Sequence, residues 1–363
     1  MVSPPAPRQA AWCAALRRPA SETQFPFSQP LCRRQEMKTL KMLRRTAVGA
    51  MVALVATWQL PAFAEYPDRP IKLIWPYAAG GLGANLARLI TDGLQERLGQ
   101  PVVMDVRPGA GGTLGMGVLK TSPPDGYTIA LSTIAPLSLA PSLYKSLPYD
   151  SVKDFEPVAM TFIGPNLIVV NASSPFKTFG DLVSFAKANP GKLSYGTAGN
   201  GSTFHLTAGL FSQLTKGELV NVPYKGGAPA FMGLLGNETN VVFGNTDSLP
   251  HVAAGKMRAL AVMSPKRVSI APDVPTTAEL GMPELMLESW YGVVAPAGTP
   301  KPIIDRLNRE ITAVLQTQRV KDALKTLSTE AAPDQSVATF RKTIASEIAR
   351  WKPVIQTAGI TAE

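Results

Sequence analysis

The residues with the clearest chemical potential in this sequence are glycines placed directly before predicted helices. Four glycine-rich segments share this position, namely 80–84, 107–113, 196–203 and 224–227. The first N–H groups of a helix have no partner within the helix, and the helix dipole makes their surroundings favourable for an anion. Because the pattern recurs, the sequence predicts a binding site for a small anionic ligand.

Ser202 and His205 are the residues whose types could act as a nucleophile and a base. They stand three residues apart at a predicted helix start, and His251 is the other histidine of the chain. A catalytic triad also needs a separate acid that orients the histidine, and the sequence contains no G-x-S-x-G segment. We therefore expect His205 to belong to the helix cap or to donate a hydrogen bond to a ligand, with an exported hydrolase as the alternative.

Metal, thiol and nucleotide chemistry are not expected from this sequence. Cys13 and Cys32 both precede residue 65, and the two histidines lack the spacing of metal ligands. The segment after 75 resembles a dinucleotide-binding loop but has Leu86 where the third glycine would stand, and no P-loop occurs. The sequence thus predicts no catalytic residue, no cofactor and no metal site.

Short apolar segments alternate with helical patterns through most of the chain. Strands are predicted at 71–75, 102–104, 127–131, 167–170, 193–195, 219–222, 240–243 and 259–262, and helices at 86–98, 179–188, 203–214 and 340–355. Thr299 and Pro300 are expected to be the N-cap and first residue of another helix. The alternation predicts parallel sheets covered by helices, in which ligands bind beyond the carboxyl ends of the strands.

The segment 37–64 has the features of a signal peptide. It begins with MKTLKMLRR, continues with an apolar stretch over 46–60 and ends in Ala62-Phe63-Ala64, so we expect cleavage after Ala64 and a periplasmic location. Residues 1–36 show no such pattern, and we interpret them as a start-site artefact or a disordered extension.

The basic residues of the chain are concentrated before residue 65. Nine basic and two acidic residues lie there, out of 36 and 26 in the whole chain, which leaves 27 basic and 24 acidic residues for 65–363. This near-neutral charge gives no reason to expect a nucleic-acid partner.

Several motifs within 65–363, read together, resemble the Bug family of extracytoplasmic solute-binding receptors of tripartite tricarboxylate transporters. They are YPDRPIKLIWPYAAGG, RPGAGGTLG with PPDGYT, YGTAGNGSTFHL, VPYKGGAPA, GKMRALAV, APDVPTTAELG, ESWYGVVAPAGTP and SEIARWKPVIQTAGI. The resemblance implies the type II periplasmic-binding-protein fold, in which two α/β domains enclose a ligand cleft and two crossover strands join them, here near 162–165 and 289–293. Domain 1 would then be 65–163 plus 288–363, and domain 2 would be 164–287.

The resemblance also implies which residues bind the ligand, mainly through backbone amides and hydroxyl groups. In domain 1 they would be Tyr77, Gly80, Gly81, Gly83, Ala84, Ser132 and Thr133, and in domain 2 Thr197, Gly199, Asn200, Ser202, Thr203, His205, Tyr224 and Asn245. Lys225 could be a counter-ion for a carboxylate or a solvated loop residue. Trp290 and Tyr291 are expected to pack at the hinge, with a place in the cleft as the alternative.

The function implied by the resemblance is capture of a small mono- or dicarboxylate by hinge closure, without catalysis. The expected partners are this ligand and the membrane permease subunits of a tripartite tricarboxylate transporter, and the receptor itself is expected to be a monomer. A ligand-dependent sensory receptor is a further alternative.

The sequence departs from the family pattern at positions that often carry acids. The first loop often reads GG-x-[ST]-D, where this chain has Gly83 and Ala84, and the family's later acids correspond to Asn240 and Gly244. Fewer carboxylates in the cleft would make a cationic group on the ligand less favourable. We therefore expect a plain carboxylate rather than an amino acid.

Overall fold

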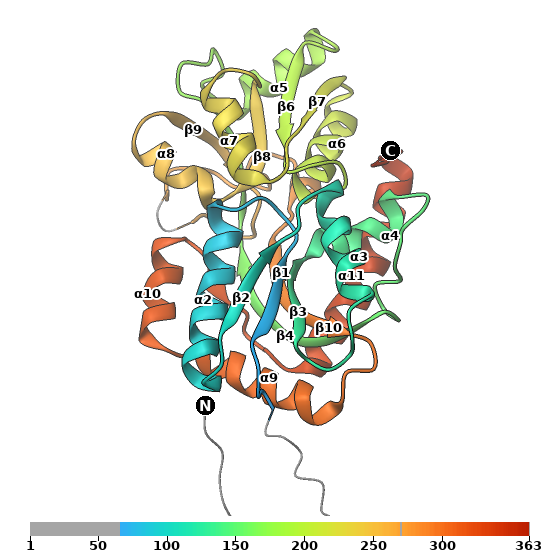
Figure 1. The fold of residues 1–363 in the computed structure, drawn as a ribbon. Coiled ribbons are helices and arrows are strands. Elements are labelled where there is room, and N and C mark those ends of the chain that lie inside the picture. Colours follow the sequence, from blue (N-terminus) through green and yellow to red (C-terminus); the bar gives the residue numbers. More distant parts are fainter. Residues whose placement is uncertain (1–65, 269–270, 363) are drawn as a thin grey trace, which may run out of the picture. The chain divides into compact units, whose positions relative to one another are not determined.

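The computed structural model describes residues 66–268 and 271–362, and these residues are built on two β-sheets (Figure 1). The predicted signal peptide at 37–64 and the stretch 1–36 lie outside the described residues. None of the described helices has the length and apolar character needed to cross a membrane.

The first sheet has six strands in the order β11-β4-β10-β3-β1-β2. Their bounds are β1 (Ile71–Trp75), β2 (Val102–Val106), β3 (Thr128–Thr133), β4 (Phe155–Gly164), β10 (Ser289–Pro296) and β11 (Glu330–Ala331). β1 pairs in parallel with β2 and β3, whereas β10 runs antiparallel to β3 and β4. The predicted strand at 71–75 therefore lies near one edge of this sheet, next to β2.

The second sheet has five strands in the order β7-β6-β8-β5-β9. Their bounds are β5 (Asn166–Asn171), β6 (Leu193–Thr197), β7 (Leu219–Pro223), β8 (Val241–Asn245) and β9 (Met257–Val262). β6 pairs in parallel with β7 and β8, and β5 runs antiparallel to β8 and β9. All five strands were predicted from their apolar runs, and the structure confirms them.

The predicted parallel pairing is confirmed for β1 with β2 and β3 and for β6 with β7 and β8, but both sheets also contain antiparallel strands and are therefore mixed. A parallel neighbour requires a long crossover, usually a helix. β5 instead follows β4 after the single residue Pro165, so the chain passes directly from one sheet into the other. It returns at Ser289, where β10 begins, and β10 pairs with β4 over most of its length. The sequence pattern did not reveal β4 or β10 as long central strands.

Helices cover both faces of the six-stranded sheet. The helices α2 (Gly81–Leu98), α9 (Lys301–Leu315) and α10 (Gln318–Thr326) contribute to one apolar core with this sheet. On the opposite face lie α3 (Thr113–Lys120), α4 (Ala140–Leu143) and α11 (Val337–Ala358). The five-stranded sheet is covered by α7 (Gly227–Leu235) and α8 (Leu249–Ala253) on one face and by α5 (Phe179–Ala188) and α6 (Thr203–Thr215) on the other.

One apolar core continues from the six-stranded sheet to the five-stranded sheet. Phe340 of α11, Leu206 of α6 and Phe243 of β8 all belong to it and are almost fully buried. The core is continuous because Ile360, just after the C-terminal end of α11, lies against Gly209 of α6. The two sheets are therefore held together by apolar packing on the side of α6 and α11.

Local capping explains where several helices begin. Thr178 and Asp181 form a reciprocal capping box at the start of α5, and the Ser202 hydroxyl accepts the His205 N–H at the start of α6. The expectation for α9 was wrong by one residue, because this helix begins at Lys301 with Pro300 as its N-cap. The Thr299 hydroxyl instead donates to the Pro296 carbonyl.

We predict that Gly292→Ala destabilises the protein by about 1–3 kcal/mol, as overpacking in a core does. A Cβ atom at Gly292, on β10, would lie 2.2 Å from the ring of Phe340, which is fully buried. The matched control is Gly180→Ala on α5, where the nearest atom outside its neighbours would be 3.6 Å away. Urea unfolding should show the loss for Gly292→Ala only, and equal midpoints for the two variants would contradict this packing.

Candidate functional site

A pocket lies where strands of both sheets end. From the six-stranded sheet it receives Trp75 at the end of β1 and Thr133 at the end of β3, and from the five-stranded sheet Asn245 at the end of β8. Its lining consists of Trp75, Tyr77, Ala78, Gly80, Gly83, Thr133, Ala198, Ser202, Thr203, Phe204, Gly226, Gly227, Ala228, Asn245, Asp247, Ser289 and Tyr291. The carboxyl ends of parallel strands are the usual ligand position in open α/β sheets. The cavity measures about 50 Å³, which suits a compact solute rather than a polymer.

Three helix starts line this pocket. α2 follows Gly80 and α7 follows Gly226, and neither N-cap glycine provides a side-chain cap. α6 follows Ser202, whose hydroxyl caps the third helical residue only. Main-chain N–H groups of all three helices are therefore directed towards one space, where they can bind the oxygens of an anion.

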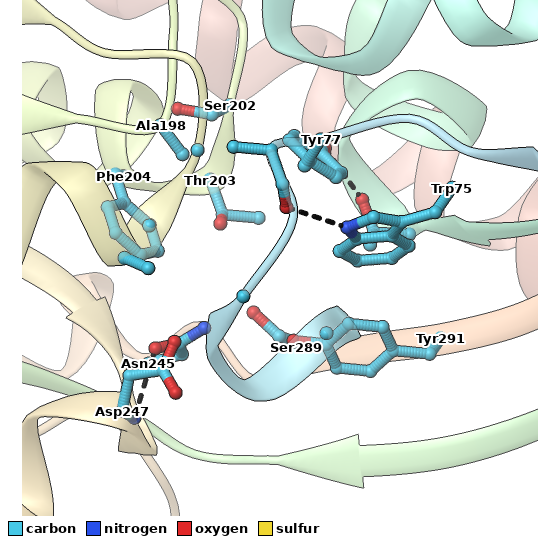
Figure 2. A pocket seen from close by; sticks show the side chains of 17 residues that line it. Trp75, Tyr77, Ala198, Ser202, Thr203, Phe204, Asn245, Asp247, Ser289 and Tyr291 are labelled. Carbon is cyan, nitrogen blue, oxygen red and sulfur yellow. Dashed lines mark hydrogen bonds between the residues drawn. The ribbon is translucent and has the colours of Figure 1, made fainter. Parts of the chain in front are cut away.

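Aromatic side chains and hydroxyl groups form the remaining walls (Figure 2). The Tyr77 ring packs against that of Trp75 with centroids 5.2 Å apart, and the indole N–H of Trp75 donates to the Ala78 carbonyl at 3.1 Å. The Tyr77 hydroxyl lies 3.0 Å from both the Gly111 carbonyl oxygen and the Thr133 hydroxyl. These contacts fix the loop after β1 against the end of β3.

The two tyrosines of the pocket are neutral hydrogen-bonding groups at physiological pH. Burial raises the pKa of the Tyr77 phenol well above its usual value, and burial together with the nearby Asp247 carboxylate does the same for Tyr291. A hydrogen bond with the Asn245 side chain partly offsets that rise for Tyr291.

Asp247 is the one ionisable acid in the lining, which contains no Lys, Arg or His. It stands two residues after the end of β8, and its backbone N–H donates to the Asn245 side chain at 3.1 Å. Its carboxylate accepts a hydrogen bond from the Leu82 N–H in the first turn of α2. The sequence had suggested a cleft poor in carboxylates, and the structure corrects that view, because a different residue supplies an acid there.

Seven of the residues expected to bind the ligand line the pocket. They are Tyr77, Gly80, Gly83, Thr133, Ser202, Thr203 and Asn245. The other eight do not, namely Gly81, Ala84, Ser132, Thr197, Gly199, Asn200, His205 and Tyr224. Local contacts explain why these eight residues lie outside the pocket lining.

Gly199 and Asn200 lie against the loop that follows β2 instead of lining the pocket. A Cβ atom at Gly111 would lie 2.4 Å from the Asn200 carbonyl oxygen, and the Tyr144 hydroxyl donates to that same oxygen at 2.7 Å. A Cβ atom at Gly199 would in turn lie 3.1 Å from the Gly111 nitrogen. These residues therefore form a contact between the loops of the two sheets.

The other expected residues that do not line the pocket have partners elsewhere or are buried. Tyr224 donates its hydroxyl to Glu238 at 2.6 Å, and Thr197 donates to Asn221 at 3.3 Å. Ala84 and Ser132 are fully buried within the six-stranded sheet and its helices, and Gly81 lies against the Asp247 carboxylate. The side chains of Thr197 and Tyr224 could bind a ligand, but here their hydroxyl groups have partners within the protein.

The geometry of Ser202 and His205 does not favour nucleophilic catalysis. The Ser202 hydroxyl accepts the backbone N–H of His205 at 3.3 Å, and the His205 Nδ1 accepts the Gly201 N–H at 3.3 Å. Burial lowers the pKa of the His205 imidazole, and this side chain does not line the pocket. The pair therefore shapes the start of α6, which is one of the two roles expected for His205.

Several of the lining residues that sequence reasoning missed lie in three segments of the chain. Ser289 and Tyr291 lie on β10, where the resemblance implies a crossover strand near 289–293, and a place in the cleft is an alternative for Tyr291 but not for Ser289. Asp247 follows the expected Asn245 by two residues, so its position after a strand was a usable signal. Gly226 and Gly227 belong to the glycine-rich segment 224–227, which is expected to precede a helix and favour an anion, but the resemblance did not imply these two glycines as individual ligand-binding residues.

Comparison with known proteins gives a consistent result. Residues 86–360 match the model of the tripartite tricarboxylate transporter family receptor. The protein BugT of Bordetella pertussis is 39% identical over 330 residues, which cover 88% of this chain and 99% of BugT.

Solved structures agree with this match. The periplasmic binding protein BugD is 33% identical with a TM-score of 0.79 and covers 82% of this chain and 99% of its own. A protein of Rhodopseudomonas palustris solved with adipate is 36% identical with a TM-score of 0.78 and the same coverage of both chains. The predicted fold is thereby confirmed as that of periplasmic solute-binding proteins, and the chain belongs to the tripartite tricarboxylate transporter receptor family.

Proposed function

We propose that this protein is a periplasmic receptor that captures a small carboxylate for a tripartite tricarboxylate transporter and does not transform it. The observation that carries the proposal is the meeting of three helix starts in one pocket that has no basic side chain. Main-chain N–H groups can bind carboxylate oxygens without a cation. Adipate in the related structure is a compound of this class.

In the proposed binding mode, the ligand carboxylate lies at the starts of α6 and α7. Thr203, Phe204, Gly227 and Ala228 belong to these first turns and line the pocket. The neutral hydroxyl group of Tyr291 supplies a further hydrogen bond, and Trp75 and Phe204 contact the carbon skeleton. No group of the lining is arranged as a nucleophile with a base, so the site supports binding rather than turnover.

The proposed receptor has two lobes, with 65–163 plus 288–363 in one and 164–287 in the other. The passage from β4 to β5 and the return at β10 support these boundaries. Periplasmic location after cleavage behind Ala64, a monomeric state and docking to the membrane permease are parts of the same proposal. Family membership supports the location and the transporter partnership.

Ligand capture would depend on closure of the two lobes. In this structure the lobes touch beside the pocket, where the Ala78 N–H donates to the Lys225 carbonyl at 2.9 Å. Gly111 and Asn200 form a second contact between the lobes. Lys225 thus takes part through its main chain, and its side chain is exposed.

We predict that a small carboxylate raises the thermal stability of the purified protein. A ligand at 100 times its dissociation constant adds about 2.7 kcal/mol to the free energy of unfolding. Thermal-shift measurements should compare straight-chain mono- and dicarboxylates of two to six carbons with the corresponding amides and alcohols. Stabilisation by the acids alone is expected, and unchanged melting temperatures with every acid would contradict the proposed function.

We also predict that Gly111→Ala weakens carboxylate binding by roughly tenfold or more, because a closed state that is populated less often binds with lower apparent affinity. The new Cβ atom would collide with the Asn200 carbonyl oxygen when the lobes are together. Gly99→Ala is the matched control, since Gly99 has a φ of 69° close to the 60° of Gly111 but has no atom near its Cβ position.

Isothermal titration calorimetry measures the carboxylate affinity of both variants, and urea unfolding compares their stabilities. Both substitutions introduce a left-handed alanine and should lower the stability to a similar extent. Equal affinities of the two variants for the same carboxylate would show that closure at this contact is not needed for binding.

A further inference from the structure

Asp247 occupies the place at the start of α2 that an anionic ligand would otherwise take. A Cβ atom at Gly81 would lie 2.5 Å from the Asp247 Oδ2 atom, so the carboxylate rests directly on the first turn of this helix. The Leu82 N–H donates to it. Asp247 comes from the five-stranded sheet and α2 covers the six-stranded sheet, so this interaction also joins the two lobes.

Besides this helix start, the Asp247 carboxylate has the Asn245 side chain as a hydrogen-bonding partner. It takes part in no ion pair among the residues that the structure describes. The titratable groups that face it are His251, one turn further along its own segment, and the neutral Tyr291 phenol from β10. Burial raises the pKa of the Asp247 carboxyl, as expected for an acid that is partly removed from water.

This placement divides the pocket into two ends of different character. At the starts of α6 and α7, Gly226, Gly227 and Thr203 present N–H groups that no acidic side chain occupies. At the start of α2, the N–H of Leu82 already has a carboxylate partner. A second ligand carboxylate at this end would lie beside a like charge, whereas a hydrogen-bond donor would find an acceptor.

We propose that Asp247 is a specificity-determining residue that makes the receptor prefer a small carboxylate bearing an ammonium or hydroxyl donor over a plain acid or a dicarboxylate of the same length. The inference rests on the proposed function, since it assumes that a carboxylate is the ligand. It departs from the sequence-based preference for a plain carboxylate over an amino acid, because that preference depended on fewer carboxylates in the cleft.

The test uses acids of matched carbon number that differ only in the group at the end away from the carboxylate or along the chain. One set is propionate, lactate, β-alanine and malonate, and the other is butyrate, 3-hydroxybutyrate, 4-aminobutyrate and succinate. Dissociation constants are measured by calorimetry for the unchanged protein, for Asp247→Asn and for Asp305→Asn. Asp305 is an exposed acid of α9 that forms an ion pair with Lys301, so its variant controls for the loss of one negative charge.

We expect the unchanged protein to bind a donor-bearing acid roughly tenfold or more tightly than the plain acid and the dicarboxylate of its set. Asp247→Asn should reduce that ratio by about tenfold and bind the dicarboxylate more tightly, because the amide carries no charge. Asp305→Asn should leave the ratio unchanged. The amino and hydroxy members of each set show which donor is preferred.

Two results would overturn the inference while leaving the proposed function intact. One is tighter binding of a plain acid or dicarboxylate by the unchanged protein, which needs no variant and so does not depend on the folding of Asp247→Asn. The other is the same preference for donor-bearing acids in Asp247→Asn as in the unchanged protein. Absence of binding by every acid would instead contradict the proposed function itself.

Discussion

The interaction on which the site depends is that between an anion and the main-chain N–H groups at the starts of α2, α6 and α7. A helix can present these groups to a ligand only when its N-cap does not satisfy them and when no side chain stands in between. Gly226 meets both conditions at the start of α7. The Ser202 hydroxyl satisfies one N–H group of α6, and the Asp247 carboxylate lies at the start of α2 after Gly80. The two sheets bring these three helix starts together at one pocket between their strand ends.

The same physical argument gives Asp247 its importance. A helix start that favours a ligand carboxylate also favours an acidic side chain of the protein that lies close enough to it. The Asp247 carboxylate lies at the start of α2 in this way. The interaction stabilises the contact between the lobes and at the same time changes the charge of one end of the pocket. Selectivity and closure are therefore linked through one side chain in this account.

Much of the fold could be predicted because local signals and tertiary structure agree. Apolar runs identified β1 and all five strands of the second sheet, and the capped start of α6 at Ser202 was correctly placed. The apolar pattern did not identify β10, and the crossover expected near 289–293 came from the family resemblance alone. β10 is buried along its whole length and carries no alternating pattern, and its pairing with β4 depends on residues far away in sequence.

The site was predicted less completely than the fold, for a related reason. Sequence pattern shows which loops precede helices but not which way each residue of a loop faces. Asn200 contacts the loop at Gly111, and His205 accepts a hydrogen bond from Gly201, although both stand in a segment that reaches the pocket.

A crystal structure of the protein with the solute that it retains through purification tests the central claim most directly. The account predicts a carboxylate with its oxygens within about 3.2 Å of main-chain nitrogens at the starts of α6 and α7. A solute held elsewhere, or one held in this pocket without contact to these nitrogens, would contradict it.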